Sequence, residues 1–297
     1  MSNNIIATTV SELIRQKVSD YKQLVKLRLN LLVVFSAVIT YMIAAKAISL
    51  EVMMFLALGG FFVTGASNAL NQVLEREFDK LMKRTADRPL AAGRMATSEA
   101  VLAAGLMSLV GITLLSYINP ICGVFGTLSL IIYAFIYTPL KRVSPVAVLV
   151  GAIPGALPTA IGAVAAEGFV SPLCIAIFGI QFFWQFPHFW AIAWLGHEDY
   201  TKAGFKLLPN ASGVLDNSIG FHSFIYSLPL IVIAMMPYLF NYTGLYSMLL
   251  IQAVNIVYSA YAWNLYRSND AVSARKLMFS SFVYLPVVLI IYLIDKI

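Results

Sequence analysis

The chain has 297 residues, of which 60% are hydrophobic and only 11% are charged, and its mean hydropathy is +0.82. A water-soluble surface cannot be built from so few polar residues, so the composition excludes a soluble globular protein and predicts a polytopic membrane protein. The net charge of +6 is explained by membrane topology, because most Lys and Arg residues are predicted to lie on one side of the membrane, as described below. We therefore infer no nucleic-acid partner from it.

The first 28 residues precede the first long apolar segment and are predicted to form a cytoplasmic N-terminal segment, followed by one transmembrane domain over residues 29–297. They carry no pattern typical of a cleavable signal. Apolar residues recur at steps of three and four between Val10 and Val25, beside several Lys and Arg residues. That spacing predicts an amphipathic helix lying on the inner leaflet.

Nine apolar windows are long enough, at roughly 18 residues or more, to cross a bilayer as a helix. They cover residues 29–48, 52–71, 99–118, 121–139, 145–166, 172–195, 219–239, 243–264 and 277–294. Cys122 and Cys174 lie in apolar surroundings without the spacing of metal ligands, so both are interpreted as structural. We therefore expect an all-α polytopic membrane protein with nine transmembrane helices.

The basic residues predict the orientation of these helices. If the nine helices alternate, 18 of the 20 Lys and Arg residues lie on the face that holds the N-terminus, and only Lys46 and Lys296 lie on the other. Cytoplasmic loops carry such an excess of positive charge. The N-terminus is thus predicted to be cytoplasmic, and the C-terminus to lie on the opposite side of the cytoplasmic (inner) membrane.

The densest run of charge, residues 71–94, follows the second window. On a helix, Asn71, Glu75 and Asp79 would be spaced at i, i+4 and i+8, which places their oxygen atoms on one face. Such donors suit Mg²⁺, which usually takes one or two carboxylates together with phosphate oxygens of a substrate. The remaining phosphate charge would be met by the basic residues Lys80, Lys83, Arg84, Arg88 and Arg94. This pattern predicts a diphosphate–metal site; the alternative is a solvated mixed-charge helix at the membrane surface.

Two shorter basic elements are predicted on the same face. Lys26-Leu27-Arg28 opens the first window, and Lys141-Arg142 follows the fourth. Cations from either element could reach a diphosphate at the cytoplasmic mouth and stabilise its charge. For both, the alternative is a simple topology anchor.

The sixth window carries a histidine, His188, well inside an apolar segment. An ionisable side chain at membrane depth suggests function by default. Its imidazole nitrogen would suit the iron of a flat macrocycle as an axial ligand, and the nearby Trp184 and Trp190 would contact the faces of the ring. The alternative is a histidine hydrogen-bonded to a neighbouring helix. Asp199, in the loop that follows, is a further candidate metal ligand.

These motifs resemble those of the UbiA-type intramembrane prenyltransferases. The first acidic motif of that superfamily, Asn-x-x-x-Asp-x-x-x-Asp, is matched from Asn71 to Asp79, with Glu75 in place of the middle Asp. Within the superfamily, residues 71–89 and the segment Pro-His-Phe-Trp at 187–190 are similar to the protoheme IX farnesyltransferases, or heme O synthases.

The chain also departs from the family's pattern. Leu27 stands where the family usually has Pro, and the Tyr-Thr-x-x-Leu-Lys-Arg stretch has one residue fewer between Thr138 and Leu140. The second acidic motif, Asp-x-x-x-Asp in many members, is reduced to Glu198 and Asp199. A second metal ion is therefore less well supported than the first.

The resemblance implies Mg²⁺-dependent transfer of the farnesyl group of farnesyl diphosphate to a vinyl group of heme b, with addition of water, to make heme O. It implies a helical bundle around a central cavity that opens to the cytoplasmic face. Beyond the bilayer and the two substrates, it implies a heme A synthase or a terminal oxidase as partners that take the product. The candidate residues are, for metal and catalysis, Asn71, Glu75, Asp79 and Asp199; for diphosphate, Arg28, Lys80, Arg84, Arg88, Lys141 and Arg142; and for heme, His188, Trp184 and Trp190.

Three other functions fit parts of the pattern. A UbiA-type enzyme acting on an aromatic or quinone precursor would share the diphosphate site but not the motifs typical of the heme enzymes. A transporter usually needs ionisable groups or broken helices near the bilayer midplane, whereas the acids here cluster at one edge. A non-catalytic oxidase-assembly subunit would have no use for a metal–phosphate site.

Overall fold

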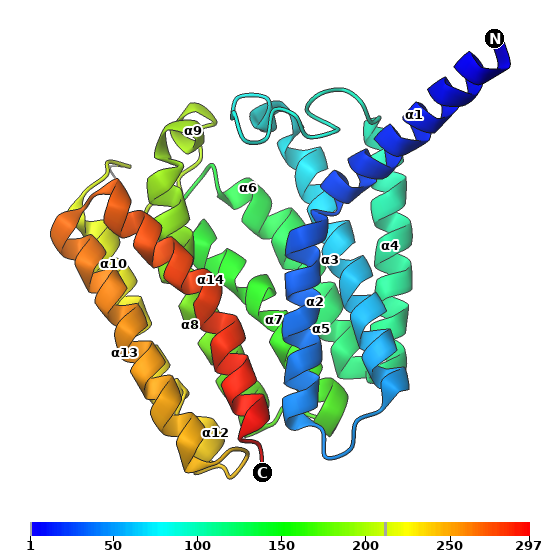
Figure 1. Ribbon diagram of the computed structural model, residues 1–297. Helices are drawn as coiled ribbons and strands as arrows, with labels where there is room; N and C mark the ends of the chain where they lie inside the picture. The colour runs from blue at the N-terminus through cyan, green and yellow to red at the C-terminus, as the bar shows by residue number, and fades with distance from the viewer. Residues whose placement is uncertain (1, 211–212) are drawn as a thin grey trace.

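The computed structural model describes residues 2–210 and 213–297, with side chains described from residue 10 onward. Figure 1 shows a bundle of long helices with the N- and C-termini at opposite ends. The first half contains α1 (Ser2–Leu24), α2 (Leu27–Ala44), α3 (Leu50–Asp79), α4 (Thr97–Ile118), α5 (Pro120–Ile131), the π-helix η1 (Ile132–Tyr137) and α6 (Thr138–Leu140). The second half contains α7 (Ala147–Glu167), α8 (Pro172–Leu195), α9 (His197–Lys202), α10 (Asn217–Ser227), α11 (Pro229–Ile233), α12 (Met236–Leu239), α13 (Leu245–Ser268) and α14 (Ala271–Ile294).

Nine spans of the described chain are helical, long and apolar enough to cross a membrane, which confirms the predicted number. Two of them are interrupted: η1 lies within the fourth span, and the seventh is divided into α10, α11 and α12. The second span differs most from its apolar window, because α3 continues for two further turns beyond Asn71 to Asp79. The acidic motif is therefore helical, as its spacing predicts.

The middle of the bundle is occupied by α7, of which 78% of the membrane window is buried. Pro158 lacks an N–H and leaves the carbonyl of Pro154 without its helical donor, and Ser129 Oγ of α5 donates to that carbonyl at 3.3 Å. Two amides of α8 donate to other α7 carbonyls, Gln181 to Gly155 and Gln185 to Ala152, each at 3.0 Å. Side chains of α5 and α8 thus hold the proline-containing helix in place.

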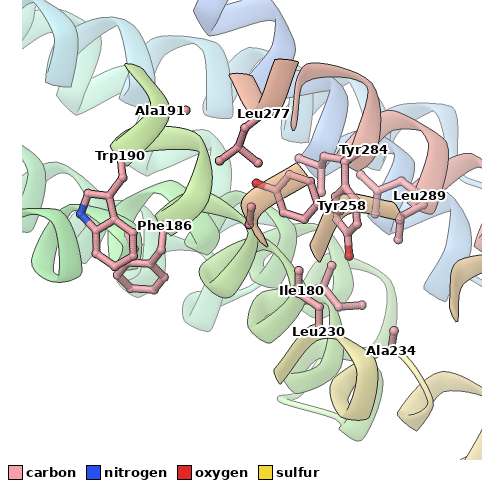
Figure 2. Packing of buried hydrophobic residues seen from close by; sticks show 14 of the residues in the cluster. Ile180, Phe186, Trp190, Ala191, Leu230, Ala234, Tyr258, Leu277, Tyr284 and Leu289 are labelled. Carbon is pink, nitrogen blue, oxygen red and sulfur yellow. The ribbon is translucent and has the colours of Figure 1, made fainter. Parts of the chain in front are cut away.

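Aromatic residues fill the core between α8 and the C-terminal helices α13 and α14. Figure 2 shows Phe186 and Trp190 of α8 beside each other, and Tyr258 of α13 close to Tyr284 of α14. All four are at most 5% exposed. This cluster joins the C-terminal helices to α8, which carries the histidine motif.

The two basic residues predicted to lie apart from the others are at the end of the bundle that holds the C-terminus. Lys46 follows α2 at that end, and Lys296 is the penultimate residue (Figure 1). Lys296 Nζ donates to the carbonyls of Met42 at 2.7 Å and Ala45 at 2.9 Å. It therefore satisfies carbonyls at the C-terminus of α2, where a cation also interacts favourably with the helix dipole.

Close contact between α2 and α7 depends on Gly162. A Cβ at this position would collide with the backbone carbonyl oxygen of Ala37, which cannot rotate away as a side chain could. We expect Gly162→Ala to destabilise the protein by about 1–3 kcal/mol, the usual cost of overpacking. Thermal unfolding in detergent measures this. The control is Gly105→Ala on α4, where a Cβ meets nothing within 4 Å; equal midpoints for both variants would contradict the proposed contact.

Candidate active site

The last turns of α3 bring the three acidic-motif residues into a buried cluster. Asn71, Glu75 and Asp79 are only 1, 5 and 1% exposed, respectively. Two other amides of the helix attach it to the end of α1: Gln72 Nε2 donates to the carbonyl of Leu24 at 3.0 Å, and Asn68 Nδ2 to that of Val25 at 3.2 Å. The carbonyls that α1 leaves unpaired at its end are thereby satisfied.

The junction between α1 and α2 brings a lysine to this cluster. Lys26 has a left-handed backbone, with φ of +49°, and its Nζ donates to Asn71 Oδ1 at 3.2 Å. Burial, together with the charges of Arg88 and Lys141, lowers the pKa of Lys26 to about 7. A bound anion would favour its charged form. Arg28, the residue selected from the sequence, is instead exposed and lines a surface hollow of about 460 Å³.

Both carboxylates of the motif are paired with cations. Glu75 forms an ion pair with Lys141 Nζ, and both side chains are less than 10% exposed. Arg88 Nη1 lies 2.8 and 2.7 Å from the two carboxylate oxygens of Asp79. Buried charges are tolerated in proteins when they are paired in this way. The structure therefore brings two of the six predicted diphosphate ligands, Arg88 and Lys141, into direct contact with the acids.

Three segments that are distant in sequence converge around these pairs. Lys141 Nζ lies over the rings of Tyr137, at 4.7 Å, and of Phe205, at 5.4 Å. The amide of Lys206 donates to the carbonyl of Lys141 at 2.6 Å. Phe205 also packs with Met82, from the loop after α3. The loops after α3 and α9 are thus joined at the end of α6, next to the acidic motif.

The other predicted diphosphate ligands occupy the exposed side of the same region. Lys80 Nζ contacts Glu77 at 2.6 Å, away from the buried acids. Arg84 Nη2 lies 3.4 Å from the hydroxyl of Tyr200, and the Arg142 guanidinium lies 4.2 Å from the ring of Phe78. These cations surround the cluster without contacting it.

Asp199 lies on the short helix α9, half-buried. Among the described residues, no interaction joins it to Glu75 or Asp79, and no group of three His, Cys, Asp or Glu side chains is arranged to hold a metal ion. The donor set on α3 nonetheless fits Mg²⁺ in chemistry, because it consists of oxygen ligands only and lies beside cations able to bind a phosphate. Asp199 remains a predicted ligand.

A threonine not selected from the sequence fixes the side chain of Asn71. Asn71 Nδ2 donates to Thr138 Oγ1 at 3.1 Å, and Thr138 Oγ1 donates to the carbonyl of Tyr133 at 2.8 Å. Tyr133 lies in η1, and π-helical turns are frequent at functional sites. Because the amide nitrogen is bound to Thr138, the oxygen Oδ1 points to the other side, toward Lys26. In the sequence, Thr138 is marked only by the resemblance of its stretch to the family's Tyr-Thr-x-x-Leu-Lys-Arg, which is one residue shorter here.

The histidine motif is divided between two faces of α8. His188 Nδ1 lies 2.7 Å from Ser281 Oγ of α14, and its ring stacks on Trp184, with centroids 4.9 Å apart. Trp190 instead packs against Tyr226 of α10, at 5.2 Å. Residues two positions apart on a helix point in directions about 200° apart. His188 and Trp190 therefore lie on opposite faces of α8 and cannot line one heme pocket. The arrangement of both tryptophans around His188, which the sequence suggested, is therefore corrected.

The model of the UbiA prenyltransferase family matches residues 32–284, most of the chain. The chain belongs to the UbiA prenyltransferase family. Its curated relatives include the protoheme IX farnesyltransferases of Christiangramia forsetii, 41% identical over 283 residues, and of Cytophaga hutchinsonii, 41% identical over 280 residues. The aligned regions cover 94 and 93% of this chain, and 93 and 97% of the two relatives.

The UbiA fold is also that of solved structures. A UbiA homolog from Archaeoglobus fulgidus bound to GPP and Mg²⁺ has a TM-score of 0.71 and 18% identity, covering 92% of this chain and 99% of that one. A structure of digeranylgeranylglyceryl phosphate synthase has a TM-score of 0.79 and 17% identity, covering 94 and 98%. At these identities the likeness shows the fold alone, and the nine-helix bundle is the fold that the sequence predicts for this UbiA-family chain.

Proposed function

We propose that this chain transfers the farnesyl group of farnesyl diphosphate to a vinyl group of heme b, with addition of water, and so makes heme O. The main support is the identity of 39–41% to relatives named protoheme IX farnesyltransferase, over more than 90% of each chain. The buried acids of α3 and their paired cations are the matching chemical feature of this chain.

The acids and cations are proposed to exchange partners when the diphosphate binds. Asn71 Oδ1, Glu75 and Asp79 would hold Mg²⁺, with Asp199 as a further ligand. The metal would act as a Lewis acid and neutralise the negative charge of the leaving diphosphate. Arg88 and Lys141, released from the carboxylates, would donate to the diphosphate oxygens and stabilise the charge that develops there.

The same cations then favour breaking the allylic C–O bond. The bonding electrons leave with the diphosphate, and the alkene of the heme vinyl group forms a new C–C bond to the farnesyl cation. Water adds to the resulting cation and loses a proton, which gives the hydroxyethylfarnesyl side chain. A central cavity opening to the cytoplasmic face is proposed to hold the farnesyl chain and exclude other water from the cation.

His188 is proposed to contact the heme. Its Nδ1 is engaged with Ser281, which fixes the ring and leaves Nε2 for the iron of the substrate. Trp184, stacked on that ring, would contact one face of the macrocycle. Trp190, which packs against Tyr226 on the opposite face of α8, is proposed to stabilise the packing of α8 against α10 instead.

The exposed cations are proposed to attract the diphosphate toward the site from the surface. They are Arg28, Lys80, Arg84 and Arg142.

The protein is proposed to lie in the cytoplasmic membrane with its N-terminal face cytoplasmic, because 18 of its 20 basic residues are predicted to lie on that face. The product would pass to a heme A synthase or a terminal oxidase.

A comparison of two acceptors tests the proposed function. Purified protein is incubated with labelled farnesyl diphosphate and Mg²⁺, and either heme b or an aromatic quinone precursor is added as the acceptor. We expect label in the heme only; label in the aromatic compound would assign the chain to the other branch of the family.

Thr138→Val is expected to weaken the apparent affinity for Mg²⁺ by about 10- to 100-fold, as loss of an orienting hydrogen bond to a metal ligand does elsewhere. Valine keeps the shape of threonine but can bond neither Asn71 nor the Tyr133 carbonyl. Thr138→Ser, which retains the hydroxyl, should stay within about threefold of wild type on the same argument. A Mg²⁺ titration of diphosphate release measures the effect, with thermal unfolding as the control for folding. Equal Mg²⁺ dependence in both variants would contradict the role given to Thr138.

A further inference from the structure

A groove of about 810 Å³ runs between α13 and α14 on the outside of the bundle, away from the acidic cluster. Its walls include Val257 of α13 and Phe279 and Val283 of α14, all more than half exposed. In a membrane protein these side chains face lipid. The groove is therefore open to the bilayer along its length.

The floor of the groove offers no free polar group. Tyr258 and Tyr284 form it, with ring centroids 4.7 Å apart. Their hydroxyls point inward, where Tyr258 donates to the Trp184 carbonyl at 3.0 Å and Tyr284 to Asn255 Oδ1 at 2.5 Å. Ser280, which also lines the groove, donates its hydroxyl to the Leu277 carbonyl at 2.8 Å, so an occupant of this part meets mainly ring and aliphatic surface. Such a surface suits a hydrocarbon chain.

The charged groups of the groove lie together at one end. Arg275 and Lys276 are exposed in the first turns of α14, and within the described chain neither side chain forms an ion pair or a hydrogen bond. The acid that precedes them, Asp270, caps the helix by accepting from the amide of Ser273 at 2.7 Å. Tyr261, whose ring also lines this end, adds an aromatic side chain of the kind enriched at membrane interfaces.

The groove is longer than the hydrocarbon part of one leaflet is thick. Its lining on α14 extends from Val272 to Val287, which corresponds to about 22 Å of helix. The hydrocarbon core of a bilayer is about 30 Å thick, so the groove reaches from the interface past the midplane. The cations lie at the interface end and the tyrosine floor lies below them.

We propose that this groove binds an anionic phospholipid from the leaflet on the N-terminal side of the membrane. The negatively charged phosphate of the headgroup lies against Arg275 and Lys276, and an acyl chain lies on Tyr258 and Tyr284. Because the floor contacts α8 through Tyr258, the lipid supports the packing of α13 and α14 against the helix that carries His188.

Native mass spectrometry of the purified full chain, titrated with phosphatidylglycerol or phosphatidylcholine, tests this site. We expect one tightly bound phosphatidylglycerol, and binding about thirtyfold weaker in the double variant Arg275→Gln, Lys276→Gln, since each cation near an anionic lipid contributes a factor of about five. Ala253→Trp, which places a large side chain in the groove without changing its charge, should also lose the lipid. Arg267→Gln, an exposed arginine at the end of α13 outside the groove, is the matched control and should bind as wild type does.

Three results would overturn the proposal. One is equal affinity for the zwitterionic and anionic lipids, and another is unchanged phosphatidylglycerol binding in the double variant and in Ala253→Trp. The third is displacement of phosphatidylglycerol by heme b at one heme per lipid, which would give the groove to the acidic propionates of heme instead.

Discussion

Asp79→Asn is expected to reduce prenyl transfer by at least about 10²- to 10³-fold, the cost of removing one group that stabilises developing charge in other enzymes. The Asp79 side chain is 1% exposed and both of its oxygens contact Arg88. The amide keeps the size of the side chain but removes the charge that Mg²⁺ and Arg88 both require. Turnover with farnesyl diphosphate and heme b measures the effect.

Glu77→Gln is the matched control for this variant. Glu77 lies two residues earlier on the same helix, but its side chain is 56% exposed and contacts Arg76 and Lys80. Ion pairs at the surface contribute little, so this variant should retain its turnover. Undiminished turnover of Asp79→Asn, with normal insertion into the membrane, would remove Asp79 from the proposed metal site.

Lys141→Met is expected to destabilise the protein by about 3–5 kcal/mol and to abolish transfer, because it leaves the carboxylate of Glu75 buried without a partner. Adding Glu75→Gln removes the uncompensated charge. The double variant should therefore recover most of the stability while remaining inactive, since both a metal ligand and a phosphate ligand are gone. Thermal unfolding and turnover, measured on the same preparations, separate these two effects.

Lys202→Gln serves as the control for a lysine on the same face. Lys202 is half-exposed and pairs with Glu198 at 2.6 Å on the surface of α9. Its replacement should change the unfolding free energy by less than about 0.5 kcal/mol. A double variant Glu75→Gln, Lys141→Met that is as unstable as Lys141→Met alone would contradict the view that the buried charge is the cause.

The number of helices and the helical acidic motif could be predicted from the sequence because each depends on a local feature: the length of an apolar segment for the first, and residue spacing for the second. A bilayer requires about 20 apolar residues per crossing, and a spacing of four residues places Asn71, Glu75 and Asp79 on one face whatever the surroundings. The partners of the acids were only partly predictable. Arg88 and Lys141 belonged to a larger set of cations, and tertiary packing decides which of them are buried.

Other features depend on backbone details that residue types do not reveal. The left-handed conformation of Lys26 brings this residue, and not Arg28, to Asn71. The π-helical turn that presents the Tyr133 carbonyl to Thr138 was not predicted from the sequence, because its apolar residues are equally compatible with an ordinary α-helix. Trp190 was grouped with His188 because the two are close in sequence, although helical geometry places them on opposite faces.

The most direct test of the proposed function is the mass of the heme extracted after purified protein is incubated with heme b, farnesyl diphosphate and Mg²⁺ in ¹⁸O-labelled water. We predict a heme heavier by one farnesyl group and one labelled water, which is absent with EDTA and with Asp79→Asn. Unchanged heme, under conditions in which the same protein prenylates a quinone precursor, would contradict the proposed acceptor while retaining the prenyl transfer common to the family.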